Sequence, residues 1–350
     1  MTLALDARQT VLRSAMRTSQ LGLLVLCGKE APELSVLSNL PANVKMLGPG
    51  RSLDELANLS DEDWASIEVI LNCGKWHNAA QKEAVRECFL KCKNVKWMHV
   101  VFAGLETVLF PELIESPVKL TNGKGVFSHS LAEYVLAGCT FFAKDFPRML
   151  AAKKASKWDP FSVEDLRGST LGVIGLGNIG LATAKLAKAY RMNVVGLRRK
   201  TELSESEKQL MDKIYPPSDI IALTKECDYV VAALPYTPKT EKFVSREALE
   251  NMKPNGVFVN VGRGKTVDEE ALIDVLQKGK IRGAVLDVVA MEPLPETSPL
   301  YKLDNVFMSA HCADNIKKAQ FTSLQLFLEV LEMYLTNGEL RNVVDKSAGY

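Results

Sequence analysis

The stretch Leu171-Gly172-Val173-Ile174-Gly175-Leu176-Gly177-Asn178-Ile179-Gly180 carries the strongest structural signal in this chain. An apolar run leads directly into a G-x-G-x-x-G turn, and the residues that follow, Ile179 to Tyr190, have the spacing of an amphipathic helix. A strand that enters a helix in this way is typical of a dinucleotide-binding unit. We expect Gly175 to permit the tight turn, Gly177 to let the backbone approach a pyrophosphate, and Gly180 to let the helix pack closely on the strand. The amides at the start of the helix would then face the anion.

Further apolar runs follow this unit at intervals that suit a parallel sheet. The predicted strands are Asn193 to Leu197, Tyr229 to Ala233, Val257 to Val261, Ala284 to Asp287 and Val306 to Met308, with a helix over Asp268 to Lys278. These runs are continuously apolar rather than alternating. Strands have this composition when helices cover both faces of a parallel sheet.

A second alternation of strands and helices precedes the glycine turn. Strands are predicted over Leu23 to Cys27, Val69 to Cys73 and Val95 to Phe102, with a helix from Ala79 to Cys92 before the last of them. A long helix is predicted over Ser128 to Phe146, followed by a connection that contains Pro147, Trp158 and Pro160, and a last helix over Asn315 to Tyr334 could return to the first domain. Because 350 residues exceed the usual size of a single hydrophobic core, we expect two α/β domains.

The composition is that of an ordinary globular protein, with 47% hydrophobic residues, 24% charged residues and a net charge of +1. This balance gives no indication of binding to nucleic acid or to a membrane surface. No apolar run reaches the ~20 residues that span a bilayer. Cys88 and Cys92 stand four apart, but no second pair or histidine follows at zinc-ligand spacing, so no metal site is predicted.

The cysteines and the first twenty residues bear on the compartment. Seven cysteines, scattered and odd in number, are more typical of a reducing compartment than of a disulfide framework, so the cytoplasm is expected. Residues 1–20 are interpreted as an N-terminal extension. Their three arginines against one acid leave a mitochondrial targeting segment as the alternative.

Only four histidines are available as proton donors near neutral pH, namely His77, His99, His129 and His311. The first three are interpreted as surface, core, or capping and contact residues. His311 follows a predicted strand, and so do Arg263 and Glu292, at the strand ends where ligands bind in an open α/β sheet. Each alone is also compatible with a solvated loop charge. Together they indicate an acid, a group that tunes it and a clamp for an anion.

Several motifs in fixed order resemble the D-isomer-specific 2-hydroxyacid dehydrogenase family over about Leu21 to Leu340. They are Ala103-Gly104, Ala132-Glu133-Tyr134-Val135, Asp165-Leu166-Arg167-Gly168, Leu234-Pro235-Tyr236-Thr237-Pro238-Lys239-Thr240, Val259-Asn260-Val261-Gly262-Arg263-Gly264, Leu286-Asp287-Val288, Glu292-Pro293-Leu294-Pro295 and Ser309-Ala310-His311. The sequence departs from the family pattern at Ala310, where a proline usually precedes the histidine, and at Glu106, where an aspartate is more common.

The resemblance implies two Rossmann-like domains with parallel sheets and an active-site cleft between them. Residues 21–125 and 318–350 would form a discontinuous substrate-binding domain, and residues 126–317 the dinucleotide-binding domain. The family commonly forms homodimers through the cofactor domain, here by the helix over Ser128 to Phe146.

The resemblance also implies roles for single residues. Arg263 would hold the substrate carboxylate and carbonyl oxygen, His311 would exchange a proton with that oxygen, and Glu292 would fix the tautomer of the imidazole and favour its protonated form. The amides near Ala103, Gly104 and Leu105 would bind the carboxylate, and Asp287 the nicotinamide amide. Other cofactor contacts are assigned to Gly175, Gly177, Asn178, Ile179, Gly180 and Pro235.

The end of the second strand of the glycine-turn unit predicts which cofactor is used. An NAD site normally places an acid about twenty residues after the turn, where it binds the ribose 2′-hydroxyl. This chain has Arg198, Arg199 and Lys200 there. Two guanidiniums able to hold a 2′-phosphate favour NADP(H), with NAD(H) as the alternative.

These observations predict an NAD(P)-dependent oxidoreductase that converts a small 2-keto acid, such as glyoxylate or hydroxypyruvate, to the D-2-hydroxy acid. Larger 2-keto acids are the alternative substrates. A different class of function stays open, because the same scaffold serves as a dinucleotide-sensing corepressor that can keep the Arg, Glu and His set.

Overall fold

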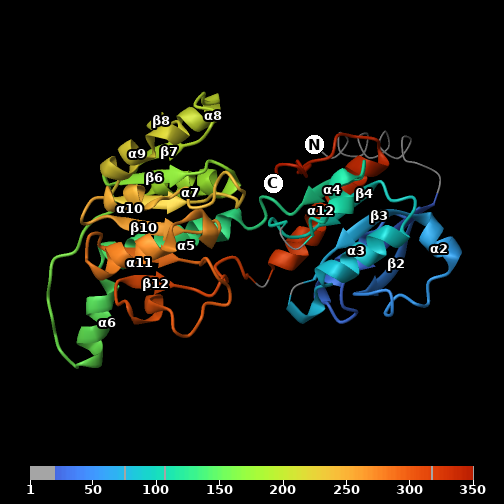
Figure 1. The fold of residues 1–350 in the computed structure, drawn as a ribbon, viewed down its shortest axis with the longest axis horizontal. Helices are drawn as coiled ribbons and strands as arrows, with labels where there is room; N and C mark the ends of the chain where they lie inside the picture. The colour runs from blue at the N-terminus through green and yellow to red at the C-terminus, as the bar shows by residue number, and fades with distance from the viewer. Residues whose placement is uncertain (1–19, 75, 106–107, 317, 350) are drawn as a thin grey trace, which may run out of the picture. The chain divides into compact units, whose positions relative to one another are not determined.

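A computed structural model describes residues 20–74, 76–105, 108–316 and 318–349 of the chain. The chain forms two compact units (Figure 1). Unit 1 comprises the described residues up to Val126 together with those after Ile316, and unit 2 comprises Phe127–Ile316. Glu106 and residues 1–19 lie outside the described residues. In the described part of the chain, no helix is both long enough and apolar enough to cross a membrane.

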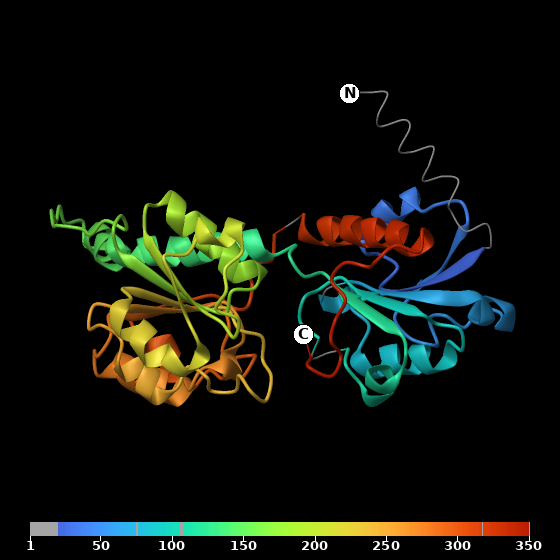
Figure 2. The same ribbon diagram turned by 90° about the horizontal axis from the view of Figure 1, so that it is seen from above.

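The described residues of unit 1 contain a five-stranded parallel sheet in the order β2-β1-β3-β4-β5. Its strands are β1 (Leu21–Leu26), β2 (Val44–Gly50), β3 (Ile67–Asn72), β4 (Trp97–Val100) and β5 (Lys119–Asn122). Helices α2 (Asp61–Ser66), α3 (Lys82–Lys91), α4 (Pro111–Glu115) and α12 (Ala319–Leu335) accompany it. Figure 2 shows α12, in red, on one face of the sheet and the cyan α3 on the other.

The last helix, α12, adds its apolar face to the core of unit 1. Leu324, Phe327 and Leu331 are buried against Leu21, Leu23 and other residues of the sheet. The sequence allowed this last helix to return to the first domain. In the structure it packs into the core of unit 1. The helix starts at Ala319, four residues later than the sequence pattern indicated.

His99 of β4 is a fully buried core residue, 0% exposed, that packs against α12. Its ring lies 5.4 Å from that of Phe327, and its Nδ1 lies 2.7 Å from Oγ1 of Thr121. The same hydroxyl oxygen accepts the indole N–H of Trp97, and among the described residues Nε2 of His99 has no hydrogen-bond partner. Burial lowers the pKa of His99 to about 3, because a charged imidazole would lose its hydration there.

The described residues of unit 2 contain a seven-stranded parallel sheet in the order β12-β11-β10-β9-β6-β7-β8. Its strands are β6 (Thr170–Ile174), β7 (Asn193–Leu197), β8 (Lys213–Tyr215), β9 (Tyr229–Ala232), β10 (Val257–Asn260), β11 (Gly283–Leu286) and β12 (Val306–Met308). The chain builds outward from β6 through β7 to β8 and then crosses to β9 on the other side. The strand order thus reverses between β6 and β9, the position at which ligands bind in such sheets.

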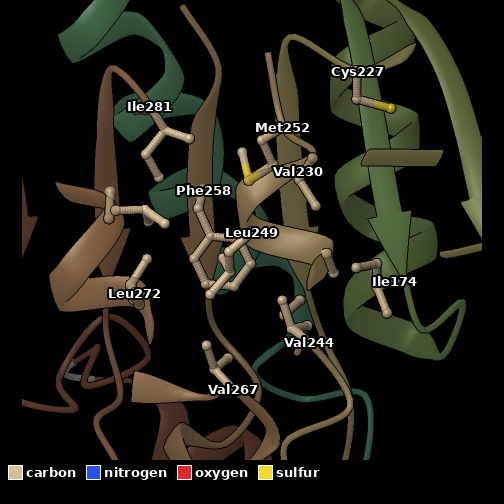
Figure 3. Close-up of a cluster of buried hydrophobic side chains, with 14 of the residues drawn as sticks. Ile174, Cys227, Val230, Val244, Leu249, Met252, Phe258, Val267, Leu272 and Ile281 are labelled. Carbon is tan, nitrogen blue, oxygen red and sulfur yellow. The ribbon is translucent and has the colours of Figure 1, made fainter. Parts of the chain in front are cut away.

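Helices cover both faces of this sheet. They are α5 (Ser128–Ala143), α6 (Phe146–Lys154), α7 (Asn178–Ala189), α8 (Glu205–Lys208), α9 (Ile220–Glu226), α10 (Arg246–Glu250) and α11 (Glu269–Gln277). Figure 2 shows α5 and α7 along one face and the yellow to orange α9, α10 and α11 along the other. Phe258 of β10 packs under the second of these helix layers, among Leu249 of α10, Leu272 of α11 and Val230 of β9 (Figure 3).

The prediction of one helix over Ser128 to Phe146 was wrong at its end. Helix α5 stops at Ala143, and Asp145 takes a left-handed conformation with φ of 51°. Its side chain accepts the backbone N–H of Arg148, so Asp145 caps a new helix, α6, in the segment that was expected to be a connection. Pro147 suits the first turn of α6, where no backbone donor is needed.

Strands β2, β5 and β8 were not predicted from the sequence. All three lie at sheet edges. Along β2 buried residues alternate irregularly with exposed ones, and β8 has three residues. An edge strand has one neighbour and can be partly exposed, and β2, β5 and β8 lack the continuous apolar run of an interior strand, whereas the edge strand β12 keeps one in Val306–Met308.

The pKa of His99 predicts a pH-dependent contribution to stability. The unfolded chain binds a proton on this residue near pH 6.5, whereas the folded chain does so only near pH 3. The contribution is therefore complete above pH 6.5 and is lost as the pH falls toward 3, at up to about 1.4 kcal/mol per pH unit. We expect His99→Gln to lose this part of the acid sensitivity, as measured by urea unfolding at pH 7, 6 and 5 with tryptophan fluorescence. Parallel curves of unfolding free energy against pH for the two proteins would contradict the assignment.

Candidate functional site

The predicted site residues of unit 2 lie in loops that follow the carboxyl ends of adjacent strands. The glycine turn follows β6, Arg198 to Lys200 follow β7, and Pro235 follows β9. Arg263, Glu292 and His311 follow β10, β11 and β12. Since all neighbouring strands are parallel, these loops share one edge of the sheet.

The glycine turn has the geometry that a pyrophosphate site requires. Gly175 has a φ of 98°, which favours glycine, and a β-carbon on Gly180 would lie 2.2 Å from the carbonyl oxygen of Gly175. A β-carbon on Gly177 would meet no atom within 4 Å, so the backbone is open on that side. Helix α7 starts at Asn178, and the N–H groups of its first turn, including those of Ile179 and Gly180, have no partner within the helix ladder. The turn therefore fits an anionic group on the helix axis.

Close backbone contacts connect the loop after β9 to the glycine turn on one side and to the Arg263 loop on the other. A β-carbon on Gly175 would lie 2.8 Å from the carbonyl oxygen of Ala233, and one on Gly262 would lie 2.6 Å from that of Leu234. The next loop is tighter still, because a β-carbon on Gly264 would lie 1.9 Å from the carbonyl carbon of Val289. These glycines on either side of Arg263 therefore let its loop pack between its two neighbours.

His311 and Glu292 form the central contact of the site. Nδ1 of His311 lies 2.7 Å from Oε2 of Glu292, and the two side chains are 42% and 38% exposed. The other carboxylate oxygen of Glu292 accepts the backbone N–H of Val289 at 3.2 Å. The carboxylate thus fixes the imidazole through Nδ1 and leaves Nε2 as the nitrogen that can meet a substrate.

Asp287 holds the loop that carries His311. Its side chain is 3% exposed, and Oδ1 accepts the backbone N–H groups of Cys312 and Ala313, both at 3.0 Å. The hydroxyl of Ser309 donates to the same oxygen at 2.5 Å, and the backbone carbonyl of Asp287 accepts the N–H of His311 at 2.9 Å. We call these four bonds the Asp287 latch.

The latch compensates for an unusual backbone at His311. This residue has a φ of 51°, in the left-handed region that costs non-glycine residues free energy, and the residue before it is Ala310. Tyr134 of α5 packs beneath the loop with its ring 5.7 Å from that of Phe307, and its hydroxyl donates to the carbonyl of Leu286. Burial raises the pKa of Tyr134 to about 12. The hydroxyl of Ser130, also on α5, donates to the carbonyl of Ala313 at 2.6 Å, so the His311 loop is held by Asp287 and by α5 without the proline common in the family.

Arg263 lies on the loop between β10 and α11. Its backbone carbonyl accepts the side-chain amide of Asn260 at 3.2 Å and the hydroxyl of Thr266 at 2.6 Å, which fixes the main chain. Its Nη1 donates to the carbonyl of Gly262 at 2.9 Å. The side chain is half-buried, and this bond fixes one nitrogen of the guanidinium. A planar guanidinium can bind a carboxylate through two parallel hydrogen bonds.

The predicted basic cluster divides into two parts. Arg198 is half-buried and forms an ion pair with Glu207 at 2.6 Å, whereas Arg199 and Lys200 are exposed. Pro235 is exposed after β9, and its carbonyl accepts the hydroxyl of Thr240 at 2.7 Å.

The predicted substrate residues Ala103, Gly104 and Leu105 lie in unit 1, after β4. Leu105 is buried, Ala103 is exposed, and the carbonyl of Ala103 accepts the side-chain amide of Asn122 at 2.9 Å. The other three histidines have other surroundings: His99 is in the core, His77 is exposed, and His129 on α5 pairs with Glu133 at 3.1 Å.

Sequence reasoning missed two residues that organise these loops, Ser309 and Glu207. Ser309 stands in a quoted motif, but no local pattern shows that its hydroxyl meets an acid 22 positions earlier. Glu207 does have a local signal, because Ser204 and Glu207 form a capping box with the S-x-x-E spacing. That spacing predicts a helix start but not the pairing with Arg198.

Comparison with known proteins identifies relatives of this chain. The model of the D-isomer specific 2-hydroxyacid dehydrogenase family, NAD binding domain, matches residues 136–313. Glyoxylate/hydroxypyruvate reductase B of Pectobacterium carotovorum subsp. carotovorum is 35% identical over 266 residues, which cover 74% of this chain and 79% of the relative. D-3-phosphoglycerate dehydrogenase of Methanocaldococcus jannaschii is 32% identical over 265 residues, which cover 75% of this chain and 50% of the relative. The chain thus spans about half the length of that relative.

A solved structure agrees with these sequence matches. The NADPH-dependent glyoxylate/hydroxypyruvate reductase of Sinorhizobium meliloti, in complex with NADP and malonate, superposes with a TM-score of 0.71 at 26% identity. The superposition covers 94% of this chain and 98% of that one. The family match over residues 136–313, which contain the glycine turn, Arg263, Glu292 and His311, shows that the chain belongs to the D-isomer specific 2-hydroxyacid dehydrogenase family.

Proposed function

We propose that this chain is an NADP(H)-dependent reductase that converts a small 2-keto acid of the glyoxylate or hydroxypyruvate type to the D-2-hydroxy acid. The observation that carries the proposal is the contact of His311 with Glu292 at 2.7 Å, at the sheet edge that also holds the glycine turn. A family relative with a similar sequence is named as a glyoxylate/hydroxypyruvate reductase, which supports this substrate class.

The proton in this reaction comes from His311. With Nδ1 held by Glu292, Nε2 gives its proton to the substrate carbonyl oxygen, and the carboxylate stabilises the positive imidazole before transfer. The nicotinamide, when bound, supplies the hydride that adds to the carbonyl carbon. In the reverse direction the neutral Nε2 takes the hydroxyl proton back.

Arg263 binds the substrate. Its planar guanidinium suits two parallel hydrogen bonds to the carboxylate. Its positive charge stabilises the negative charge that develops on the carbonyl oxygen in the transition state. The tight packing at Gly264 holds the Arg263 loop against the loop after β11. Arginine and histidine thus act from the ends of β10 and β12, on either side of β11.

The choice of cofactor rests on charge at the end of β7. No acid stands at residues 198–200 to accept a ribose hydroxyl or to repel a 2′-phosphate. The similar reductase of Sinorhizobium meliloti is named as NADPH-dependent and was solved with NADP. These facts support NADP(H) over NAD(H), with a preference of roughly ten- to a hundredfold.

We further propose a homodimer that forms through unit 2. Helix α5 is largely buried within its own unit, so the exposed apolar residues of α6 and the segment after it are the better candidates for the contact. Leu150 is 61% exposed and Trp158 is 94% exposed. Exposed apolar side chains gathered on one segment mark interaction sites in soluble proteins.

The first experiment measures turnover of His311→Asn. We expect the parent to reduce glyoxylate or hydroxypyruvate with NADPH, at a kcat/KM ten- to a hundredfold above that with NADH. His311→Asn should lower kcat by about a hundredfold or more and leave NADPH binding intact. His129→Asn, which changes an exposed histidine paired with Glu133, is the matched control. A parent that binds NADPH but reduces none of a panel of short and long 2-keto acids would instead favour the sensor class.

A second experiment tests the Asp287 latch. Asp287→Ala leaves the amides of Cys312 and Ala313 without their acceptor, which should destabilise the protein by about 2–4 kcal/mol and lower kcat at saturating NADPH. Asp287→Asn keeps an oxygen for the same donors and should lose less of both. Thermal unfolding and steady-state kinetics measure the two effects, and equal losses in both variants would argue against the latch.

The homodimer is tested by sedimentation velocity at micromolar concentration. The parent should sediment at twice the 38.6 kDa of one chain, and the double change Leu150→Asp with Trp158→Asp should shift it toward the monomer. Tyr301→Asp changes another exposed aromatic residue, 54% exposed, and should leave the dimer intact. A parent that sediments only as a monomer would rule the dimer out.

A further inference from the structure

In the loop between β7 and α8, four of the five N–H donors of Arg198 form hydrogen bonds within the protein. Nε of Arg198 donates to the carbonyl of Lys200 at 2.5 Å, and Nη2 also donates to the carbonyl of Glu202. Nη1 and Nη2 donate to the two carboxylate oxygens of Glu207, at 2.6 and 3.2 Å. A guanidinium has five N–H donors, so these four bonds leave one. Arg198 as it stands cannot form the paired bonds with which arginine holds a phosphate.

Glu207 is fixed in turn by the start of its own helix. Its Oε2 accepts the backbone N–H of Ser204 at 2.9 Å and the hydroxyl of Ser204 at 2.8 Å. The Arg198 guanidinium, together with Ser204, lowers the pKa of Glu207 to about 2, so the carboxylate keeps its charge at any pH of interest. The ion pair is 20% exposed on the arginine side and 16% on the glutamate side.

Two consequences follow for an anion that approaches this loop. The charge of Arg198 is neutralised by Glu207, and a phosphate placed at Arg198 would also meet the negative carboxylate. The carbonyls of Lys200 and Glu202 are drawn onto the guanidinium, which sets the path of the backbone between them. Residues 199–202 are exposed, and Arg199 and Lys200 are the two basic side chains among them.

We propose that Glu207 is a positioning residue for cofactor selection, which holds Arg198 as the anchor of the loop so that Arg199 and Lys200 meet the 2′-phosphate. This inference rests on the proposed use of NADP(H). It changes the role assigned to Arg198 in the sequence analysis. Arg198 does not bind the 2′-phosphate itself but holds the loop that carries Arg199 and Lys200. Glu207 acts through Arg198 and touches neither cofactor nor substrate.

The substitution Glu207→Gln separates positioning from simple electrostatics, because the two predict opposite signs. Removal of a negative charge beside the site should tighten NADPH binding if only charge matters. If Glu207 positions the loop, the same change should weaken NADPH binding about three- to tenfold and leave NADH binding within twofold. Glu205→Gln on the same short helix removes the same charge from a side chain that is 89% exposed and forms an ion pair with Lys208 at 2.5 Å. This matched control should leave NADPH binding unchanged or slightly tighter.

The measurement is equilibrium binding of NADPH and of NADH to the full chain, followed by nicotinamide fluorescence without substrate. Arg199→Ala should weaken NADPH binding at least tenfold and spare NADH, whereas Arg198→Lys, which keeps the charge but cannot make the four bonds, should resemble Glu207→Gln. Retained NADH binding shows that a variant is folded. NADPH binding that is unchanged or tighter in Glu207→Gln would overturn the proposal, as would an Arg199→Ala variant with the affinity of the parent. A parent that binds neither dinucleotide would overturn the proposed function itself.

Discussion

Parallel strand pairing in unit 2 is the constraint on which the candidate site depends. Parallel neighbours require the chain to return along a helix after each strand, so every strand ends at the same edge of the sheet. The loops after β6, β7, β9, β10, β11 and β12 are thereby collected into one row, although the residues in them span more than a third of the chain. The reversal of strand order between β6 and β9 places the glycine turn inside this row rather than at its end.

A row of loops has few backbone partners of its own, and the structure provides them in two ways. Where two loops touch, a glycine removes the side chain between them, as at Gly262 against Leu234 and at Gly264 against Val289. In the loop after β12, a carboxylate accepts the hydrogen bonds instead. Asp287 accepts those of the Ser309 hydroxyl and of the backbone N–H groups of Cys312 and Ala313. A buried carboxylate is costly without hydrogen-bond donors, and the donors of Ser309, Cys312 and Ala313 therefore account for the burial of Asp287 at this edge.

Three acids at this edge have different tasks because they meet different donors. Asp287 accepts mainly backbone amides and holds a loop, Glu292 accepts an imidazole and orients a proton donor, and Glu207 accepts a guanidinium and supports the end of β7. The carboxylate group is the same in each. Its role is set by the neighbour that the fold brings to it, which is why residue type alone did not separate the three.

The amino-acid sequence by itself determined the interior strands, the edge strand β12 and the glycine turn, and it predicted Arg263, Glu292 and His311 in the loops after β10, β11 and β12. Continuous apolar runs and glycine spacing are local signals that depend on residues within one strand or one turn. The edge strands β2, β5 and β8, the break at Asp145, the Asp287 latch and the pairing of Arg198 with Glu207 were decided by the tertiary structure. Edge strands owe their hydrogen bonds to a neighbouring strand, and the latch joins residues 22 to 26 positions apart. Such contacts require atoms within about 3 Å of one another, and only the folded chain brings residues so far apart in sequence to that distance.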